Sequence, residues 1–300
     1  MKDELKYLLN YISGRDVAGR YFATFPDDTF LVSFPRSGNT WTRFLIGNLV
    51  QPNEPITFLN VEKVIPDTAA VSKGYLKRIR RPRLLKSHQF FDSRYKKVMY
   101  IVRDPRDVVL SYYNWQRKYG EIEDDYPLAP YITRFISGDL PGLIGWGSWG
   151  EHVLSWLATR YNRPGFLLLR YEAMLAEPAG ELKKVAEFMG IEATPESLAT
   201  AVQRSSAENM RTMERSQSDR WIVTKGRRKD IPFVGEARRG SWHSLLPDSA
   251  VEQIESAWGP LMKTLGYDLT RCPSSALQPP FTQLGNWATW QTQPIRQPTI

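Results

Sequence analysis

The segment that most constrains this chain is residues 30–41, Phe-Leu-Val-Ser-Phe-Pro-Arg-Ser-Gly-Asn-Thr-Trp, an apolar strand followed by a short loop and a helix start. In this order the free backbone N–H groups of the helix start point at one place, where the helix dipole adds positive potential. Gly38 permits close backbone approach, and Arg36 adds a planar cation. Further side-chain donors come from Ser37, Asn39 and Thr40. The segment therefore predicts a P-loop-like, phosphate-binding loop.

This loop is not one of the common nucleotide-binding loops. It matches neither G-x-x-x-x-G-K-[ST] nor G-x-G-x-x-G. A short turn containing Ser and Gly also occurs without any ligand, so other segments have to decide between an anion site and a plain turn.

Composition and charge narrow the class of protein. A chain of 300 residues with 42% hydrophobic and 24% charged residues fits one α/β domain. Its only cysteine, Cys272, excludes an internal disulfide, and the charged start and the lack of a long apolar run predict a cytoplasmic protein without a membrane span. The net charge of +8 favours anionic ligands. Nucleic acid is one such ligand in principle, but a small anionic cofactor explains the excess without it.

The order of apolar segments predicts the architecture. Strands are expected at 29–34, 83–87, 98–103 and 166–171, and helices at 41–50, 106–116, 150–162, 180–189, 195–211 and 248–265. Such alternation predicts an α/β fold with a mostly parallel central sheet flanked by helices. We expect a lead-in helix and linker at 1–26, one domain at 27–270 and a loosely packed or disordered tail at 271–300. The polar stretch 216–239 is a candidate mobile lid.

Two further segments end in polar residues that suit an anion site. A buried strand ends at Arg103, and Ser111 follows two turns into the next helix, so both can face one anion. The alternative for Arg103 is a structural ion pair with Asp107. Lys86-Ser87-His88 follows another short strand. Because ligands gather at the carboxyl ends of parallel strands, we expect these segments and the loop to share one crevice.

Five segments in order resemble the sulfotransferases that use 3′-phosphoadenosine-5′-phosphosulfate (PAPS). The first loop is similar to their P-[KR]-S-G-x-T-W, residues 86–88 to K-[ST]-H, and residues 103–113 to R-[ND]-P-[KR]-D-V-x-x-S-Y-Y. Residues 147–156 resemble G-S-W-x-x-H-V-x-x-W, which makes His152 a candidate acceptor contact, and residues 170–174 resemble [FVR]-Y-E-D-M. The matches cover roughly residues 28–270.

The resemblance implies a role for each matched residue. It implies that PAPS is bound, and its product 3′-phosphoadenosine 5′-phosphate (PAP) released, by Arg36, Ser37, Gly38, Asn39, Thr40, Trp41, Arg103, Ser111 and Tyr171. His88 is the implied catalytic base, since a neutral imidazole can take the proton of an acceptor hydroxyl. Lys86 and Arg36 are the implied catalytic cations, which stabilise negative charge on the departing phosphate. No metal is required.

Three departures from the family pattern stand out. Arg36 replaces the usual Lys, which keeps the charge but makes proton donation to the leaving group unlikely. Ser205 can serve as a phosphate-binding hydroxyl, although Ala207 stands where an aromatic usually covers the adenine. In residues 233–242 the usual Arg-Lys pair is missing, so we expect Arg239 and Gly240 to bind the 3′-phosphate from a shifted loop.

The sequence thus predicts an enzyme that transfers a sulfuryl group from PAPS to a hydroxyl acceptor by in-line displacement. The acceptor is a small molecule, a sugar or a lipid, and the sequence does not choose among them. A nucleotide kinase or NTPase would need a Walker-type lysine and a carboxylate for Mg²⁺, which the first loop lacks. An inactive basic binding scaffold would have no need of His88. A homodimer is possible, although the family's dimer signature is absent.

Overall fold

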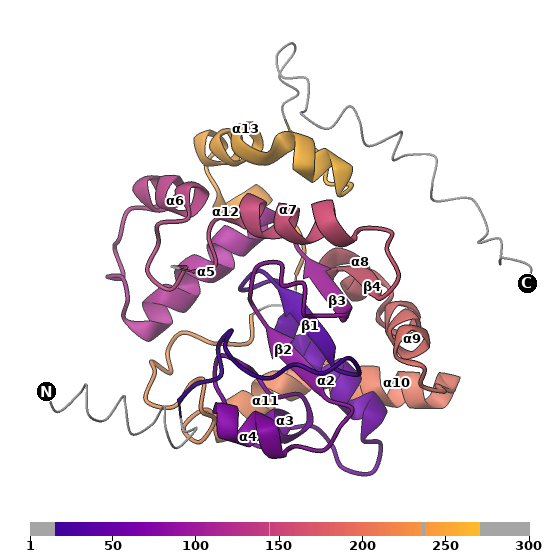
Figure 1. The fold of residues 1–300 in the computed structure, drawn as a ribbon. Coiled ribbons are helices and arrows are strands. Elements are labelled where there is room, and N and C mark those ends of the chain that lie inside the picture. Colours follow the sequence, from indigo (N-terminus) through magenta and orange to yellow (C-terminus); the bar gives the residue numbers. More distant parts are fainter. Residues whose placement is uncertain (1–15, 144, 236–237, 271–300) are drawn as a thin grey trace, which may run out of the picture. The chain divides into compact units, whose positions relative to one another are not determined.

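A four-stranded parallel sheet forms the centre of the fold. The computed structural model describes residues 16–143, 145–235 and 238–270. Its strands are β1 (Thr29–Ser33), β2 (Leu84–Ser87), β3 (Lys97–Val102) and β4 (Phe166–Arg170), in the order β2-β1-β3-β4 with every pair parallel (Figure 1). All four predicted strands are confirmed, and each begins and ends within one residue of its predicted position. The predicted α/β class is therefore confirmed as well.

Helices occupy most of the remaining described chain. They are α2 (Asn39–Val50), α3 (Val61–Val64), α4 (Lys73–Arg78), α5 (Pro105–Tyr119), α6 (Leu128–Ser137), α7 (Trp149–Arg160), α8 (Tyr171–Ala176), α9 (Pro178–Met189), α10 (Pro195–Arg204), α11 (Ala207–Gln217), α12 (Trp242–Leu245) and α13 (Asp248–Thr264). The prediction of one helix at 195–211 is wrong, because α10 ends at Arg204 and a second helix, α11, begins at Ala207. There the hydroxyl of Ser206 accepts a hydrogen bond from the Asn209 N–H and starts α11.

The sheet buries a different set of side chains on each face. Leu31, Met99, Ile101 and Leu169 pack with residues of α2, α8, α9 and α10 in one hydrophobic cluster. On the other face, Tyr100 of β3 packs on Trp156 of α7, with ring centroids 6.2 Å apart. Figure 1 shows α2 and α10 on one side of the sheet and α7 on the other. Since both faces are covered, a ligand would meet the sheet at the carboxyl ends of its strands, as expected for an α/β fold.

Hydrogen bonds hold the described part of the polar stretch 216–239, which was predicted to be a mobile lid. The Lys118 ammonium donates to the carbonyls of Arg228 at 2.6 Å and Ile231 at 2.7 Å. The Glu214 carboxylate accepts from the backbone N–H groups of Phe233 at 2.6 Å and Val234 at 2.8 Å. These buried, charge-assisted hydrogen bonds hold the stretch from two sides and argue against a mobile lid.

The chain divides into two compact units, residues 1–246 and residues 247–300. The sheet and every residue of the candidate site belong to the first unit, and the second contains α13. The predicted lead-in helix falls largely outside the described residues, as does the predicted tail at 271–300. In the described part of the chain no helix is long and apolar enough to cross a membrane.

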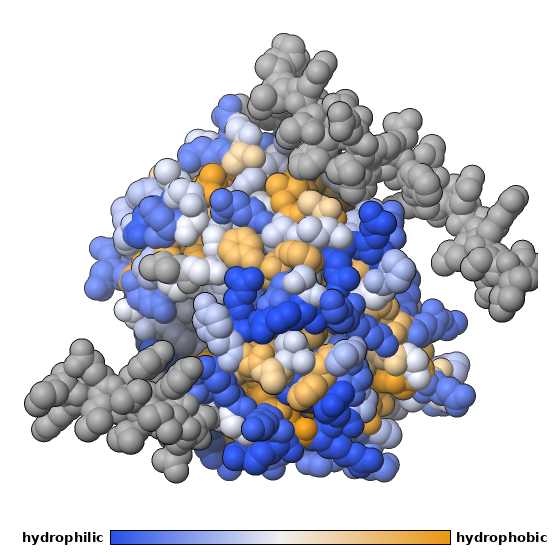
Figure 2. Space-filling model, viewed as in Figure 1, coloured by the Kyte–Doolittle hydropathy of each residue, from blue (hydrophilic) through white to orange (hydrophobic). Residues whose placement is uncertain are grey.

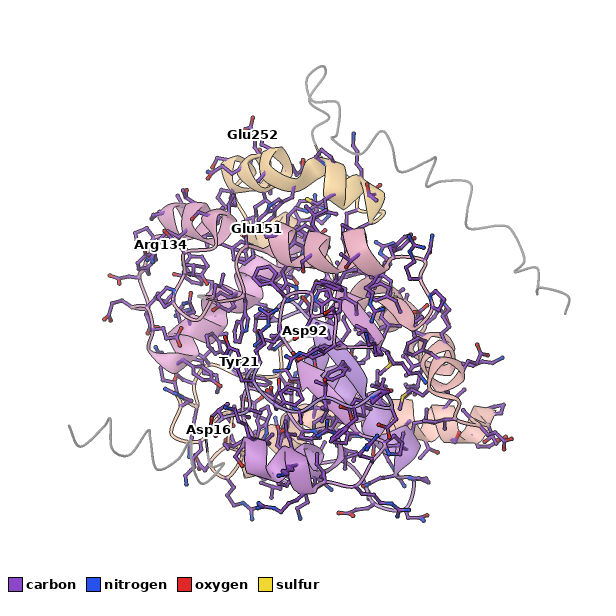
Figure 3. All side chains as sticks on the ribbon, viewed as in Figure 1. Asp16, Tyr21, Asp92, Arg134, Glu151 and Glu252 are labelled. Atoms are coloured by element: carbon purple, nitrogen blue, oxygen red, sulfur yellow. The ribbon has the colours of Figure 1, made fainter. Side chains whose placement is uncertain are left out.

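Large hydrophobic side chains are seldom exposed among the described residues. Those that are exposed are Val17, Tyr21, Leu59, Ile222 and Leu245. Figure 2 shows hydrophobic residues on the viewed face in patches interrupted by hydrophilic side chains. Tyr21, which is 79% exposed, is labelled in Figure 3.

Candidate functional site

The loop between β1 and α2 forms the predicted cradle. Gly38 adopts a left-handed conformation (φ 93°) at the start of α2, and no side chain caps the helix there. The hydroxyl of Ser37 is buried and has no hydrogen-bond partner among the described residues. An uncapped helix start beside an unpartnered buried hydroxyl is a set of donors aimed at one place. This arrangement suits an anionic group.

Arg36 and Ser111 meet at this loop, although they are far apart in the sequence. The Nε of Arg36 donates to the Ser111 hydroxyl oxygen at 3.1 Å, and its Nη2 donates to the Phe233 carbonyl at 3.3 Å. Burial lowers the pKa of Arg36 to about 10. The guanidinium therefore stays charged at neutral pH, and its bond to Ser111 joins the β1–α2 loop to α5, as expected for two segments that share one crevice.

Arg103 and Tyr171 both contact the β1–α2 loop. The Arg103 Nη1 donates to the Arg36 carbonyl at 3.1 Å, whereas its Nε is buried without a partner among the described residues. Its guanidinium lies 4.4 Å from the centroid of the Tyr171 ring. That ring packs so closely on Gly38 that a methyl group there would lie 2.6 Å from Cε2 of Tyr171. Trp41 meets Tyr171 edge-on, with ring centroids 5.8 Å apart.

His88 lies just after β2, with one ring nitrogen fixed. Its Nδ1 lies 2.7 Å from the Ser33 carbonyl oxygen. Because a carbonyl can only accept, Nδ1 carries the proton and donates it, which leaves Nε2 as a free base. Burial and the nearby Lys86 ammonium lower the pKa of His88 well below its usual value of 6.5. The imidazole is therefore neutral at physiological pH, as general-base chemistry requires.

Lys86 is held by a carboxylate that the sequence reading did not single out. Its Nζ donates to Oδ2 of Asp67 at 2.6 Å, and both residues are buried. Behind this pair, Arg43 forms a second ion pair with Glu62 at 2.9 Å. Burial lowers the pKa of Lys86, and the Asp67 carboxylate opposes that shift. The cation thus lies near His88 with its charge partly balanced.

His152 holds the backbone of His88 instead of lining an acceptor site. It is fully buried on α7, which starts with a capping box of Ser148 and Glu151. Glu151 is labelled in Figure 3. Its Nε2–H donates to the His88 carbonyl at 3.0 Å, and its Nδ1 accepts from the Tyr100 hydroxyl at 2.8 Å. The expected acceptor contact is therefore wrong, because both ring nitrogens serve the protein itself.

Two predicted cofactor ligands turn their side chains inward. The Nδ2 of Asn39 donates to the Ser33 hydroxyl at 3.2 Å, whereas its Oδ1 is buried without a hydrogen-bond partner among the described residues. Ser205 is fully buried, and its hydroxyl accepts from the Asn48 side chain at 3.1 Å. The Ser205 hydroxyl thus has a protein partner, and its role in binding phosphate stays a prediction. Thr40 remains partly exposed at the start of α2.

The loop at residues 238–242 is bound to the start of α5. The Gly240 N–H donates to Oδ2 of Asp107 at 2.8 Å, whereas Arg239 is exposed. Asp107 therefore holds this loop and does not form the alternative ion pair with Arg103. The roles of Arg239 and Gly240 in binding phosphate stay predictions.

Comparison with known proteins identifies the family of the chain. The family model of the sulfotransferase domain matches residues 26–266. The chain belongs to the sulfotransferase family. Among curated sulfotransferases, rat (Rattus norvegicus) sulfotransferase 2A6 is 31% identical over 79% of this chain and 85% of that protein. Bovine (Bos taurus) sulfotransferase 1A1 is 30% identical over 80% of this chain and 85% of that protein.

Solved structures share the sulfotransferase fold. Retinol dehydratase in complex with androsterone and PAP superimposes with a TM-score of 0.68 at 18% identity, covering 88% of each chain. Mouse sulfotransferase SULT7A1 in complex with PAP gives a TM-score of 0.63 at 22% identity, covering 81% of this chain and 87% of that one. Among the described residues, no three His, Cys, Asp or Glu side chains gather in a way that could hold a metal ion.

Sequence reading missed two of the residues that support this sulfotransferase site, Ser33 and Asp67, and gave the third, His152, a different role. Ser33 fixes the tautomer of His88, Asp67 pairs with Lys86, and His152 holds the His88 carbonyl. His152 lies within a segment that resembles the family, which was a usable signal. Asp67 lies in a stretch without a motif, and only the fold brings it to Lys86.

The buried His152 makes the stability of this sulfotransferase sensitive to acid. Burial lowers the pKa of His152 to about 4 from the usual 6.5. Between these values the unfolded chain binds a proton that the folded protein refuses, so the free energy of unfolding falls as the pH drops. The fall contributed by this residue is on the order of 3 kcal/mol. Urea unfolding at pH 7 and pH 4.5 should show a smaller fall for His152→Gln, and equal falls would contradict the assignment.

Proposed function

We propose that this sulfotransferase takes PAPS as its sulfuryl donor and releases PAP, transferring the group to a hydroxyl acceptor. The observation that carries the proposal is the cradle, where an uncapped helix start, the buried hydroxyl of Ser37 and the Nε of Arg103 have no protein partners among the described residues. Buried polar atoms in native proteins are normally hydrogen-bonded, so these donors suit a polyanionic ligand. Structural neighbours in complex with PAP add support.

Each part of the nucleotide would be held by residues already placed around the loop. The backbone N–H groups at the start of α2 and the Ser37 hydroxyl would bind the 5′-phosphosulfate. Arg103 and Ser111 would bind the 3′-phosphate, and Trp41 and Tyr171 would hold the adenine. Ser111 is at present bonded to Arg36, so binding of the 3′-phosphate would require that Arg36 share or release it.

His88 would act as the general base of the transfer. Its unprotonated Nε2 takes the acceptor's hydroxyl proton while the acceptor oxygen forms a bond to sulfur and the bond from sulfur to the phosphate oxygen breaks. Lys86 and Arg36 would stabilise the negative charge that grows on the departing phosphate. The pKa of Arg36, about 10, keeps it an electrostatic partner and not the proton donor at neutral pH.

The pH dependence of kcat follows from the protonation state of His88. Because burial and Lys86 lower the pKa of His88, kcat at saturating substrates should stay level as the pH falls through 6.5 and decline only well below it. The double variant Lys86→Met/Asp67→Asn removes the Lys86 ammonium, which lowers the pKa of His88 more than Asp67 raises it, and leaves no buried carboxylate unpaired. In this variant the decline of kcat should move to higher pH. A wild-type decline centred at 6.5 or above would contradict the base assignment.

The activity itself is tested by following PAP release from PAPS with panels of small-molecule, sugar and lipid alcohols. Release that depends on one acceptor class supports the proposal and names the acceptor. Structural neighbours were solved with androsterone and with retinol, so steroid and isoprenoid alcohols are the first to try. A cytoplasmic location and a homodimer stay predictions beside this proposal.

A further inference from the structure

Asp107 joins two parts of the protein that the sequence separates widely. Its carboxylate is buried and accepts two backbone hydrogen bonds from the same loop, from Gly240 at 2.8 Å and from Trp242 at 3.1 Å. Gly240 has a positive φ of 73°, so the loop turns sharply at this contact. One carboxylate therefore fixes the path of residues 240–242 against the start of α5.

A second contact fastens the same loop. The guanidinium of Arg106 lies 3.7 Å from the centroid of the Trp242 ring. Arg106 is itself held by Asp104, with hydrogen bonds of 2.9 Å from Nε and 2.7 Å from Nη2. The loop is thus bonded through its backbone to Asp107 and stacked through its side chain on Arg106.

Asp107 is not the cap of α5. That function belongs to Asp104, whose carboxylate accepts from the Arg106 N–H at 2.9 Å. Both carboxylate oxygens of Asp107 accept a hydrogen bond from the loop. A buried carboxylate that serves a distant loop and not its own helix indicates that the position of the loop matters.

The loop carries a cation, Arg239, next to its contact with the start of α5. Arg103 directly precedes Asp104, the cap of α5, and Ser111 follows one turn after Asp107 on the same helix. Arg239 directly precedes Gly240, is exposed, and forms no ion pair with any other described residue. Asp107 therefore fixes the backbone next to this cation relative to α5, the helix that carries Ser111 and begins just after Arg103.

We propose that Asp107 is a positioning residue for the 3′-phosphate subsite, holding the 238–242 loop so that Arg239 reaches the phosphate. The proposal rests on the proposed use of PAPS. It explains how this chain supplies the charge although Gly235 and Glu236 stand where the family's Arg-Lys pair is expected. Asp107 itself would touch no part of the nucleotide.

The test compares two nucleotides that differ only in the 3′-phosphate. Calorimetric titration of the full chain with PAP and with adenosine 5′-monophosphate gives the ratio of their affinities. Asp107→Asn can keep one hydrogen bond to the loop but sets an amide N–H against the other, so the ratio should fall about tenfold or more. Asp125→Asn, at an exposed position, removes the same charge and should leave the ratio unchanged.

Each outcome distinguishes this inference from the proposed function. A wild-type protein that does not prefer PAP contradicts the proposed function and removes the subsite with it. A folded Asp107→Asn protein with an unchanged ratio overturns the positioning role alone. If Asp107→Asn does not fold, Arg239→Ala decides, since this exposed side chain can be removed without loss of packing. An unchanged ratio in that variant also overturns the inference.

Discussion

Replacing His88 with alanine is expected to lower kcat by about 10²- to 10⁴-fold, the usual contribution of a general base, while PAP binds almost as tightly as before. The loss is chemical, because Nε2 of His88 is the nitrogen that the Ser33 carbonyl leaves unprotonated. The donors proposed to bind PAP lie on the β1–α2 loop and α5 instead. Single-turnover kinetics beside calorimetry separate these two quantities.

Two controls make this result specific to the base. Added imidazole should restore part of the activity of His88→Ala, since it supplies a base to the space left by the side chain. Ser33→Ala, which removes the hydroxyl but keeps the carbonyl that fixes the tautomer, should retain most of kcat. Transfer at the wild-type rate in His88→Ala would show that another group takes the proton.

Gly38→Ala is the second change with a large expected effect, because both backbone and packing forbid a side chain there. Gly38 has φ 93°, and an added methyl group would lie 2.6 Å from Cε2 of Tyr171. The loop or the Tyr171 ring has to move, which disturbs the donors proposed to bind the 5′-phosphosulfate. We expect unfolding free energy to fall by about 1–3 kcal/mol and PAP affinity to fall about 100-fold.

A glycine with the same backbone conformation provides the matched control. Gly190 has φ 72° at the end of α9, and a methyl group there would meet nothing within 4 Å. Gly190→Ala should therefore cost about 1 kcal/mol through strain alone and leave PAP affinity unchanged. If both variants weaken PAP binding equally, the close approach of Tyr171 to Gly38 has no special role in the cradle.

The sheet and the cradle could be predicted from the sequence because their signals are local. Each strand is a short apolar run, and Gly38 marks a turn with positive φ that lies against the Tyr171 ring, where a larger residue would not fit. The place of His88 after a strand was enough to bring it to the edge where β1 also ends, since parallel strands share that edge.

The side-chain directions could not be predicted, because tertiary partners decide them. Asn39 turns to the Ser33 hydroxyl, and Ser205 is closed in by Asn48. Both residues are of polar types that also bind phosphate, so residue type alone does not show whether the side chain binds a ligand or another side chain. The break between α10 and α11 was missed because its signal, Ser206 as a helix cap, lies within a continuous polar run.

The most direct test of the central claim is a calorimetric titration of the purified chain with PAP, beside ATP with Mg²⁺. If the β1–α2 loop, Arg103 and Ser111 hold an adenosine bisphosphate, PAP will bind tightly without added metal and ATP will bind much more weakly. Tighter binding of ATP with Mg²⁺, or no binding of either nucleotide, would contradict the claim that this sulfotransferase fold uses PAPS.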